Sequence, residues 1–233
     1  MFAASIAGHA AADGNGNSDW ANLAKYRAEN AALVRPDAAH PRVVFMGDSI
    51  TEFWGNVPDG IFANHDYVNR GISGQTTPQM LLRFRADVIE LKPAAVVILA
   101  GTNDIAGNTG PATPEQIEGN LASMVELAQA HGIKVILASL LPTTHYDWAP
   151  QVQPVAKIAA VNRWIEDYAR QHKLVYIDYH TPMADAHAGM NRAYSDDGVH
   201  PNAAGYKVMN PLARQAIVRA IGKHDAHGTS SAR

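Results

Sequence analysis

A serine at position 49 follows the apolar run Val43–Met46 within the segment RVVFMGDSIT, residues 42–51. The run is rich in β-branched and aromatic residues and stops at Gly47, which is typical of a buried strand that ends in a turn. Helix N-termini favour negative charge, so a serine between such a strand and a following helix is a candidate nucleophile. A helix N-cap is the competing interpretation, because serine often supplies that cap.

Loops with polar residues and glycines follow several of the predicted strands. Four of them carry side chains that could do chemistry: Gly47–Ser49, Asn69–Gly74, Gly101–Asp104 and Ser195–Asn202. Each loop alone is typical of an ordinary turn, since glycine and asparagine are common turn residues. Ligands of open α/β sheets bind at the carboxyl ends of the strands, so the four loops together predict a site at that edge.

These four loops resemble the four sequence blocks of the GDSL/SGNH hydrolases, which are serine esterases and lipases with a flavodoxin-like fold. The resemblance covers roughly residues 43–206, and the strings GDSITEFW and NRGISGQTT are most similar to the branch of platelet-activating-factor acetylhydrolase catalytic subunits. It implies an esterase that needs no cofactor, with a catalytic triad of Ser49, Asp197 and His200 and an oxyanion hole formed by Ser49, Gly71 and Asn103.

The chemistry of such a site follows from its residue types. A serine hydroxyl is a poor nucleophile at neutral pH and needs a general base within hydrogen-bond distance. His200 suits that role because histidine exchanges its proton near neutral pH. A carboxylate on the second ring nitrogen would fix the tautomer, and Asp197 reaches it if Gly198 lets the turn fold tightly. The oxyanion donors named above would stabilise the negative charge of a tetrahedral intermediate.

Several alternatives remain for the individual roles. Asp196 adjoins Asp197, and Asp178 ends the last predicted strand, where other hydrolase folds place their acid. Ser73 lies near two glycines, but the G-x-S-x-G motif of α/β-hydrolases is absent and we expect a loop residue there. The chain has no cysteine and no H-E-x-x-H or similar spacing, so the sequence predicts no catalytic metal.

The elements that must position these residues alternate between strand and helix patterns. Such alternation predicts an α/β fold, a three-layer α/β/α sandwich with a five-stranded, mostly parallel sheet. The predicted strands are residues 43–46, 67–69, 94–100, 133–140 and 174–177. The predicted helices are residues 20–33, 76–90, 114–130, 155–171 and 203–221, of which the third opens with the capping box Thr113–Gln116.

Chain length, charge and composition limit the number of domains and the kinds of partner that this protein can have. The chain has 233 residues, which predicts one domain, residues 20–222, between flexible segments 1–19 and 223–233. A net charge of −3 gives no reason to expect nucleic acid, and no apolar run is long enough to span a membrane. Small apolar residues near the N-terminus resemble the end of a signal peptide, which favours a secreted or periplasmic protein over a cytoplasmic one.

The substrate is predicted to be a small ester with a short acyl group, acetyl to butyryl, on a sugar or glycerol derivative. The connecting loops are short, and only 142–154 is long and irregular. Asp48, Tyr146 and Trp148 are the candidate substrate-binding residues, because an aromatic face with polar groups suits a polar ring. An acyltransferase and a non-catalytic binder of acylated sugars are the alternatives to a hydrolase.

Overall fold

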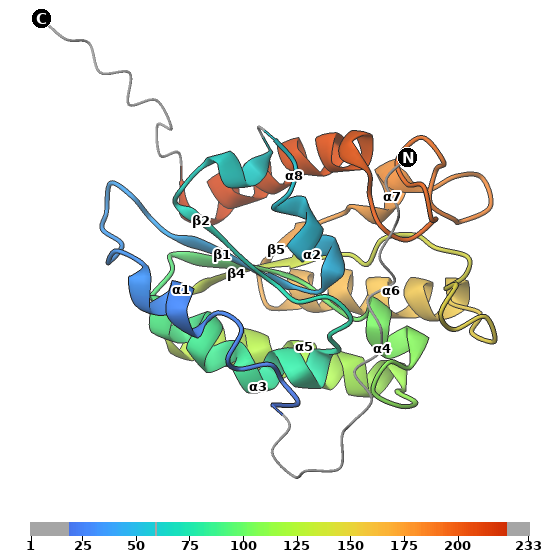
Figure 1. Ribbon diagram of the computed structural model, residues 1–233, viewed down its shortest axis with the longest axis horizontal. Coiled ribbons are helices and arrows are strands. Elements are labelled where there is room, and N and C mark those ends of the chain that lie inside the picture. Colours follow the sequence, from blue (N-terminus) through green and yellow to red (C-terminus); the bar gives the residue numbers. More distant parts are fainter. Residues whose placement is uncertain (1–18, 59, 223–233) are drawn as a thin grey trace, which may run out of the picture.

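Five parallel strands form the centre of the protein, whose computed structural model describes residues 19–58 and 60–222. The sheet has the order β2-β1-β3-β4-β5, and each neighbouring pair is parallel (Figure 1). This is the flavodoxin-like order, in which the strand sequence reverses beside β1. The prediction of a five-stranded, mostly parallel sheet is confirmed. The strands are β1 (Val43–Gly47), β2 (Tyr67–Gly71), β3 (Ala95–Leu99), β4 (Lys134–Ala138) and β5 (Val175–Ile177).

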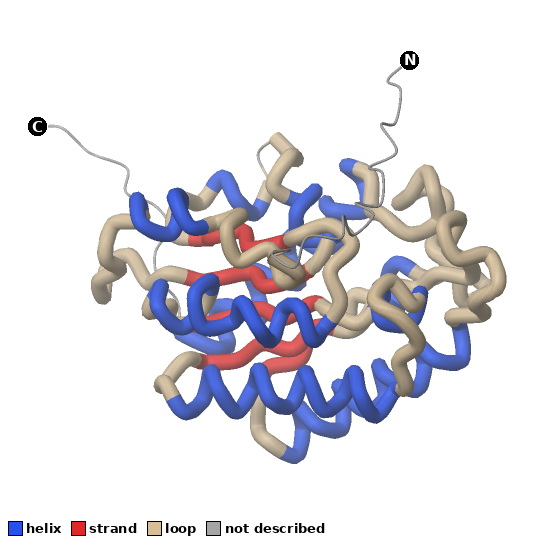
Figure 2. The backbone as a smooth tube through the Cα atoms, turned by 60° about the horizontal axis from the view of Figure 1, so that its bottom comes forward, coloured by secondary structure: helices blue, strands red, loops and turns tan. Residues whose placement is uncertain are grey.

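Helices cover both faces of the sheet, so that the strands lie between two helical layers (Figure 2). One face packs against α3 (Thr77–Asp87), α5 (Pro114–Ala130) and α6 (Val155–Gln171). The other packs against α2 (Ser49–Trp54), α7 (His180–Met183) and α8 (Ala203–Ile221). The shorter elements are α1 (Arg27–Ala32), α4 (Thr102–Ala106) and the 3-10 turns Ile61–Ala63 and Ile89–Leu91.

The apolar runs of the sequence are explained by burial on both faces. Val44 and Met46 point to the layer of α3, α5 and α6, whereas Val43 and Phe45 point to the layer of α2 and α8. Successive side chains of a strand alternate between faces, so a strand covered on both sides must be apolar throughout. All five residues of β1 are buried. The chain that follows Gly47 therefore leaves the buried sheet at its carboxyl edge.

Local signals define the helix ends that matter for the site. Thr113 forms a capping box with Gln116 and is followed by proline at the first helical position, as predicted for α5. Thr76 forms a second capping box with Gln79 at the start of α3. The predicted bounds of α6 and α8 agree with the structure.

The predicted helix over residues 20–33 is wrong for most of its length, because only Arg27–Ala32 is α-helical. Upstream, the Asp19 carboxylate accepts hydrogen bonds from the amides of Leu23 and Ala24. The carbonyls of Trp20 and Ala21 accept from glutamine side chains of the α3 region instead of from helical amides. Tertiary hydrogen bonds therefore replace helical ones in this segment.

The predicted flexible ends of the chain lie largely outside the residues that the structure describes. The predictions for residues 1–19 and 223–233 concern segments that lie outside the described residues, apart from Asp19. Within 19–58 and 60–222, no helix has the length and apolarity needed to cross a bilayer.

Candidate active site

Ser49 lies where the sequence predicts it, two residues after Gly47, which is the last residue of the buried strand β1. Asp48 is the N-cap of α2, and its carboxylate accepts a hydrogen bond of 2.9 Å from the Ile50 amide. Ser49 is therefore the first residue of the helix and not its cap. Its hydroxyl is free to contact another side chain, and the positive end of the helix lies beside it.

His200 and Asp197 form a continuous line of hydrogen bonds with this serine. The Ser49 Oγ lies 2.9 Å from His200 Nε2, and His200 Nδ1 lies 2.7 Å from Asp197 Oδ2. The turn between the two residues contains Gly198 at φ +78°, a conformation that glycine adopts without strain. The imidazole side chain is 24% exposed, so a ligand from solvent can reach this line of atoms.

The Asp197 carboxylate is held in its ionised form. Burial disfavours the charge, but hydrogen bonds from the His200 ring and from the amides of His200 and Val199 outweigh it. The pKa of Asp197 is thereby held well below its usual range. Hydrogen bonds to the charged form of a carboxylate have this effect in general.

The two alternative acids make different contacts. Asp196 Oδ1 accepts a long hydrogen bond of 3.4 Å from Asn202, and Asp178 Oδ1 accepts from the Thr181 amide in the first turn of α7. Ser73 donates to the Glu52 carboxylate in a surface loop, as expected for a loop residue. Of these three aspartates, Asp197 is the one whose carboxylate bonds to the His200 ring.

Gly71 does not have the environment of an oxyanion donor, which corrects the prediction. Its amide donates to Asn69 Oδ1 at 2.8 Å, so the N–H is already used. A Cβ on Gly71 would come within 2.2 Å of the Glu52 nitrogen, which means that the absent side chain permits close packing of β2 on α2.

Gly74, three residues further, is the better candidate. It is exposed at φ +77°, and its amide has no hydrogen-bond partner among residues 19–58 and 60–222. The sequence placed both glycines in the loop after the predicted strand 67–69. In the structure β2 extends to Gly71, whereas Gly74 lies in the loop beyond it.

Asn103 is positioned by the first turn of α4. The residue is 3% exposed, and its Nδ2 donates to the Gln75 carbonyl at 3.0 Å. A primary amide carries two hydrogens, so a second N–H is left for a ligand. Its Oδ1 accepts from Asn108 Nδ2 at 3.0 Å, which orients the amide.

A fully buried arginine, Arg83, joins these loops beneath the surface. Its guanidinium donates to the Gly47 carbonyl at the end of β1, to Gln75 Oε1 and to Asp87 Oδ2, at 2.6–3.0 Å. Planar guanidinium groups hold several acceptors in a fixed geometry. Arg83 thus ties the strand before Ser49 to the loop that accepts from Asn103.

Of the three candidate substrate-binding residues, only Trp148 remains accessible. Asp48 is 1% exposed and serves as a helix cap, and burial raises its pKa to about 6. Tyr146 is fully buried, and its hydroxyl bonds to Thr102. Both polar groups bond to partners inside the protein, the Ile50 amide and the Thr102 hydroxyl. The predictions for Asp48 and Tyr146 as substrate contacts are therefore wrong.

Two exposed aromatic rings flank the imidazole. The Trp148 ring lies 6.3 Å from the His200 ring and the Phe53 ring lies 5.3 Å from it, measured between centroids. Both side chains are more than a third exposed. Phe53 was missed in the sequence, although its position four residues after Ser49 puts both on one face of α2.

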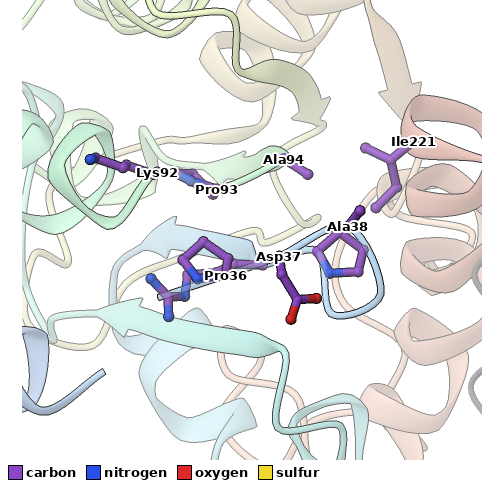
Figure 3. Close-up of a pocket in the computed structure, with 9 residues that line it drawn as sticks. Pro36, Asp37, Ala38, Lys92, Pro93, Ala94 and Ile221 are labelled. Carbon is purple, nitrogen blue, oxygen red and sulfur yellow. The ribbon is translucent and has the colours of Figure 1, made fainter. Parts of the chain in front are cut away.

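A pocket of about 370 Å³ occupies the opposite end of the sheet (Figure 3). It is lined by residues that precede β1 and β3, including Pro36, Asp37, Arg42 and Lys92. Parallel strands place their functional loops at the carboxyl edge, so this pocket at the amino edge is separate from Ser49.

Comparison with known proteins identifies the family of this chain. Residues 45–208 match the GDSL-like Lipase/Acylhydrolase family, and the chain belongs to that family. The protein is accordingly a carboxylic ester hydrolase. It is 34% identical to Esterase TesA of Pseudomonas aeruginosa over 184 residues, which cover 74% of this chain and 85% of that protein.

A solved structure and a third relative extend the comparison. The crystal structure of a GDSL-like lipase from Bacteroides thetaiotaomicron superposes with a TM-score of 0.84 at 48% identity, covering 86% of this chain and 98% of that one. The acetylxylan esterase of Geobacillus stearothermophilus is 29% identical over 170 residues, 66% of this chain and 71% of that protein.

Proposed function

We propose that the protein is a serine esterase that hydrolyses short-chain carboxylic esters through an acyl-enzyme, with Ser49, His200 and Asp197 as its catalytic triad. The observation that carries this proposal is the unbroken line from Ser49 Oγ to His200 to Asp197, with distances of 2.9 and 2.7 Å. Nucleophile, base and orienting acid must lie within such distances for the base to take the serine proton.

In the first half of the reaction, Ser49 Oγ attacks the ester carbonyl carbon and its proton moves to His200 Nε2. The bond from carbon to the alcohol oxygen then breaks, and the Nε2 proton passes to the departing alkoxide. In the second half, water attacks the acyl carbon and gives its proton to Nε2. That proton returns to Ser49 Oγ as the acid leaves. Asp197 stabilises the transient imidazolium.

The oxyanion in both halves is proposed to accept hydrogen bonds from the Ser49 amide, the Gly74 amide and Asn103 Nδ2. The Ser49 amide belongs to the first turn of α2, where N–H groups have no helical acceptor. The Gly74 amide and the second Asn103 N–H are unpaired within the described part of the chain. Preorganised donors of this kind stabilise developing charge strongly.

The preferred substrate is proposed to be an acetyl to butyryl ester of a sugar or glycerol derivative. Among residues 19–58 and 60–222, the aromatic rings beside His200 are those of Phe53 and Trp148, which lie 5.3 and 6.3 Å from the imidazole between centroids. Each methylene of an acyl chain contributes about 0.8 kcal/mol only where apolar surface covers it. An aromatic face with polar neighbours suits a sugar ring, and one relative is named an acetylxylan esterase.

A chain-length series tests this proposal. We expect kcat/KM to be highest for acetyl to butyryl esters of one chromogenic alcohol and to fall for octanoyl and palmitoyl esters. A maximum at octanoyl or longer would refute the short-chain preference.

Substitution Trp148→Ala is the companion measurement on acetylated sugars. It should lower kcat/KM about fivefold, because a ring contact is worth about 1 kcal/mol. Trp20→Ala is the control, since Trp20 is also exposed and no ring contact with His200 is recorded for it among the described residues. Equal effects of both substitutions would remove Trp148 from the binding site.

The protein is also proposed to act outside the cytoplasm. Support comes from residues 1–19, whose small apolar residues and Gly8–Ala10 segment resemble the end of a signal peptide. Fractionation of the producing cell should place esterase activity in the periplasm or the medium. Activity confined to the cytoplasm would overturn this location.

A further inference from the structure

Asn108 lies just beyond α4, five residues after Asn103, and its backbone amide donates to the Asn103 carbonyl at 3.0 Å. Gly107 precedes it at φ +81°, which turns the chain back toward the site. None of the four sequence blocks that suggested the active site includes Asn108. Its side chain is partly buried, and it faces three segments that are far apart in the sequence.

All the hydrogen-bonding groups of the Asn108 side chain are used within the site. Nδ2 donates to the Gly74 carbonyl and to Asn103 Oδ1, each at 3.0 Å. Oδ1 accepts from Trp148 Nε1 at 2.9 Å. One amide group thus joins two proposed oxyanion donors to the aromatic ring beside His200.

We propose that Asn108 is a positioning residue that holds the oxyanion hole in its productive geometry and couples it to Trp148. This inference rests on the proposed function. Asn108 contacts neither the ester nor the reacting atoms in the mechanism above. It acts through the residues that do.

The orientation of Asn103 explains why such a residue matters. An asparagine side chain can rotate by half a turn and exchange its oxygen with its nitrogen. Exchange at Asn103 would direct a carbonyl dipole, instead of an N–H, toward the negative oxygen of the intermediate. The donor Asn108 Nδ2 bonds to Asn103 Oδ1 and therefore selects the orientation in which the N–H faces the ligand.

Gly74 needs a similar restraint. It is exposed and has no side chain, so only backbone hydrogen bonds hold it at φ +77°. Within residues 19–58 and 60–222, the hydrogen bond recorded for its backbone is the one from Asn108 Nδ2 to its carbonyl. The alcohol part of a bound ester that packs against Trp148 contacts a ring whose Nε1 donates to Asn108. The Asn108 side chain therefore links alcohol binding to the geometry of the oxyanion donors.

The test uses Asn108→Asp and Asn108→Ala. The aspartate keeps the shape and the acceptor for Trp148, but puts a second oxygen against Gly74 O and Asn103 Oδ1. We expect both variants to lower kcat about tenfold or more while KM stays within about twofold, because the lost contacts act on the transition state. Affinity for a trifluoromethyl ketone, which forms a tetrahedral adduct, should fall in parallel with kcat.

Thr109→Ala is the matched control in the same loop. The Thr109 hydroxyl bonds to Thr76 and makes no recorded hydrogen bond to Gly74 or Asn103, so kcat and trifluoromethyl ketone affinity should stay within about twofold.

A second experiment uses Trp148→Phe, which keeps an aromatic ring and removes the Nε1 donor. It should lower kcat in the wild-type background and have no further effect in Asn108→Ala, as a double-mutant cycle measures.

The outcomes separate this inference from the function it rests on. Asn108 variants with unchanged kcat and ketone affinity in an active esterase would overturn the positioning role alone. A loss that appears only in melting temperature or only in KM would do the same. An inactive wild-type protein, or an active Ser49→Ala variant, would instead refute the proposed function.

Discussion

Substitution of Ser49 by alanine is expected to lower kcat/KM for acetyl esters by about 10⁴-fold or more, as in other enzymes whose nucleophile is removed. The hydroxyl forms the covalent bond to the acyl group, and no neighbouring group replaces it. The fold should persist, because Ser49 Oγ makes its one side-chain hydrogen bond to a partly exposed imidazole. The measurement is steady-state kinetics on purified variants with matched thermal unfolding.

Ser73→Ala provides the matched serine control for this variant. Its hydroxyl bonds to Glu52 in the neighbouring loop and lies outside the line of hydrogen bonds to His200. Activity within about threefold of wild type is expected for it. A Ser49→Ala variant that keeps more than about a tenth of the wild-type rate would show that the nucleophile is elsewhere.

Asp197→Asn is the second substitution with a large expected effect. In serine-protease triads the same exchange costs about 10⁴-fold in kcat, because the amide stabilises the wrong imidazole tautomer. A similar loss is expected here, since Asp197 Oδ2 lies 2.7 Å from His200 Nδ1. Asp196→Asn is the adjacent control and should retain most of the activity. Equal losses in the two variants would contradict the assignment of the acid.

The pH dependence of wild-type kcat/KM follows from the same contact. The pKa of Asp197 is lowered by its hydrogen bonds, so this carboxylate stays ionised throughout the working range. Activity should rise from acid to neutral pH, because a general base must be neutral to accept a proton from Ser49. Activity that falls as pH rises through the neutral range would contradict a histidine base.

The strands and long helices were predictable because their signals are local. Buried parallel strands require continuous apolar runs, and the run at 94–100 surrounds β3. The capping box at Thr113 marks the start of α5 within the chain itself. The order of the polar loops then placed Ser49 and Asn103 after the neighbouring strands β1 and β3 and His200 just before α8, since the fold leaves few topologies to consider.

The errors concern features that tertiary contacts decide. Tyr146 and Asp48 have polar groups and lie beside the site in the sequence, but their burial depends on packing against distant segments. The choice between Gly71 and Gly74 depends on which amide is already paired, and the partner of Gly71 is the side chain of Asn69. Asn108 was not recognised at all. Its side chain contacts Asn103 in α4 and two loop residues, Gly74 and Trp148, that are 34 and 40 residues away.

Covalent labelling is the most direct test of the central claim that Ser49 is an activated nucleophile. An alkyl p-nitrophenyl phosphonate should release one p-nitrophenolate per chain and abolish esterase activity in proportion. Peptide mass spectrometry should place the phosphonyl group on Ser49, and Asp197→Asn should slow its attachment far more than Asp196→Asn. An adduct on any other residue, or full ester hydrolysis by a chain labelled at Ser49, would contradict the account.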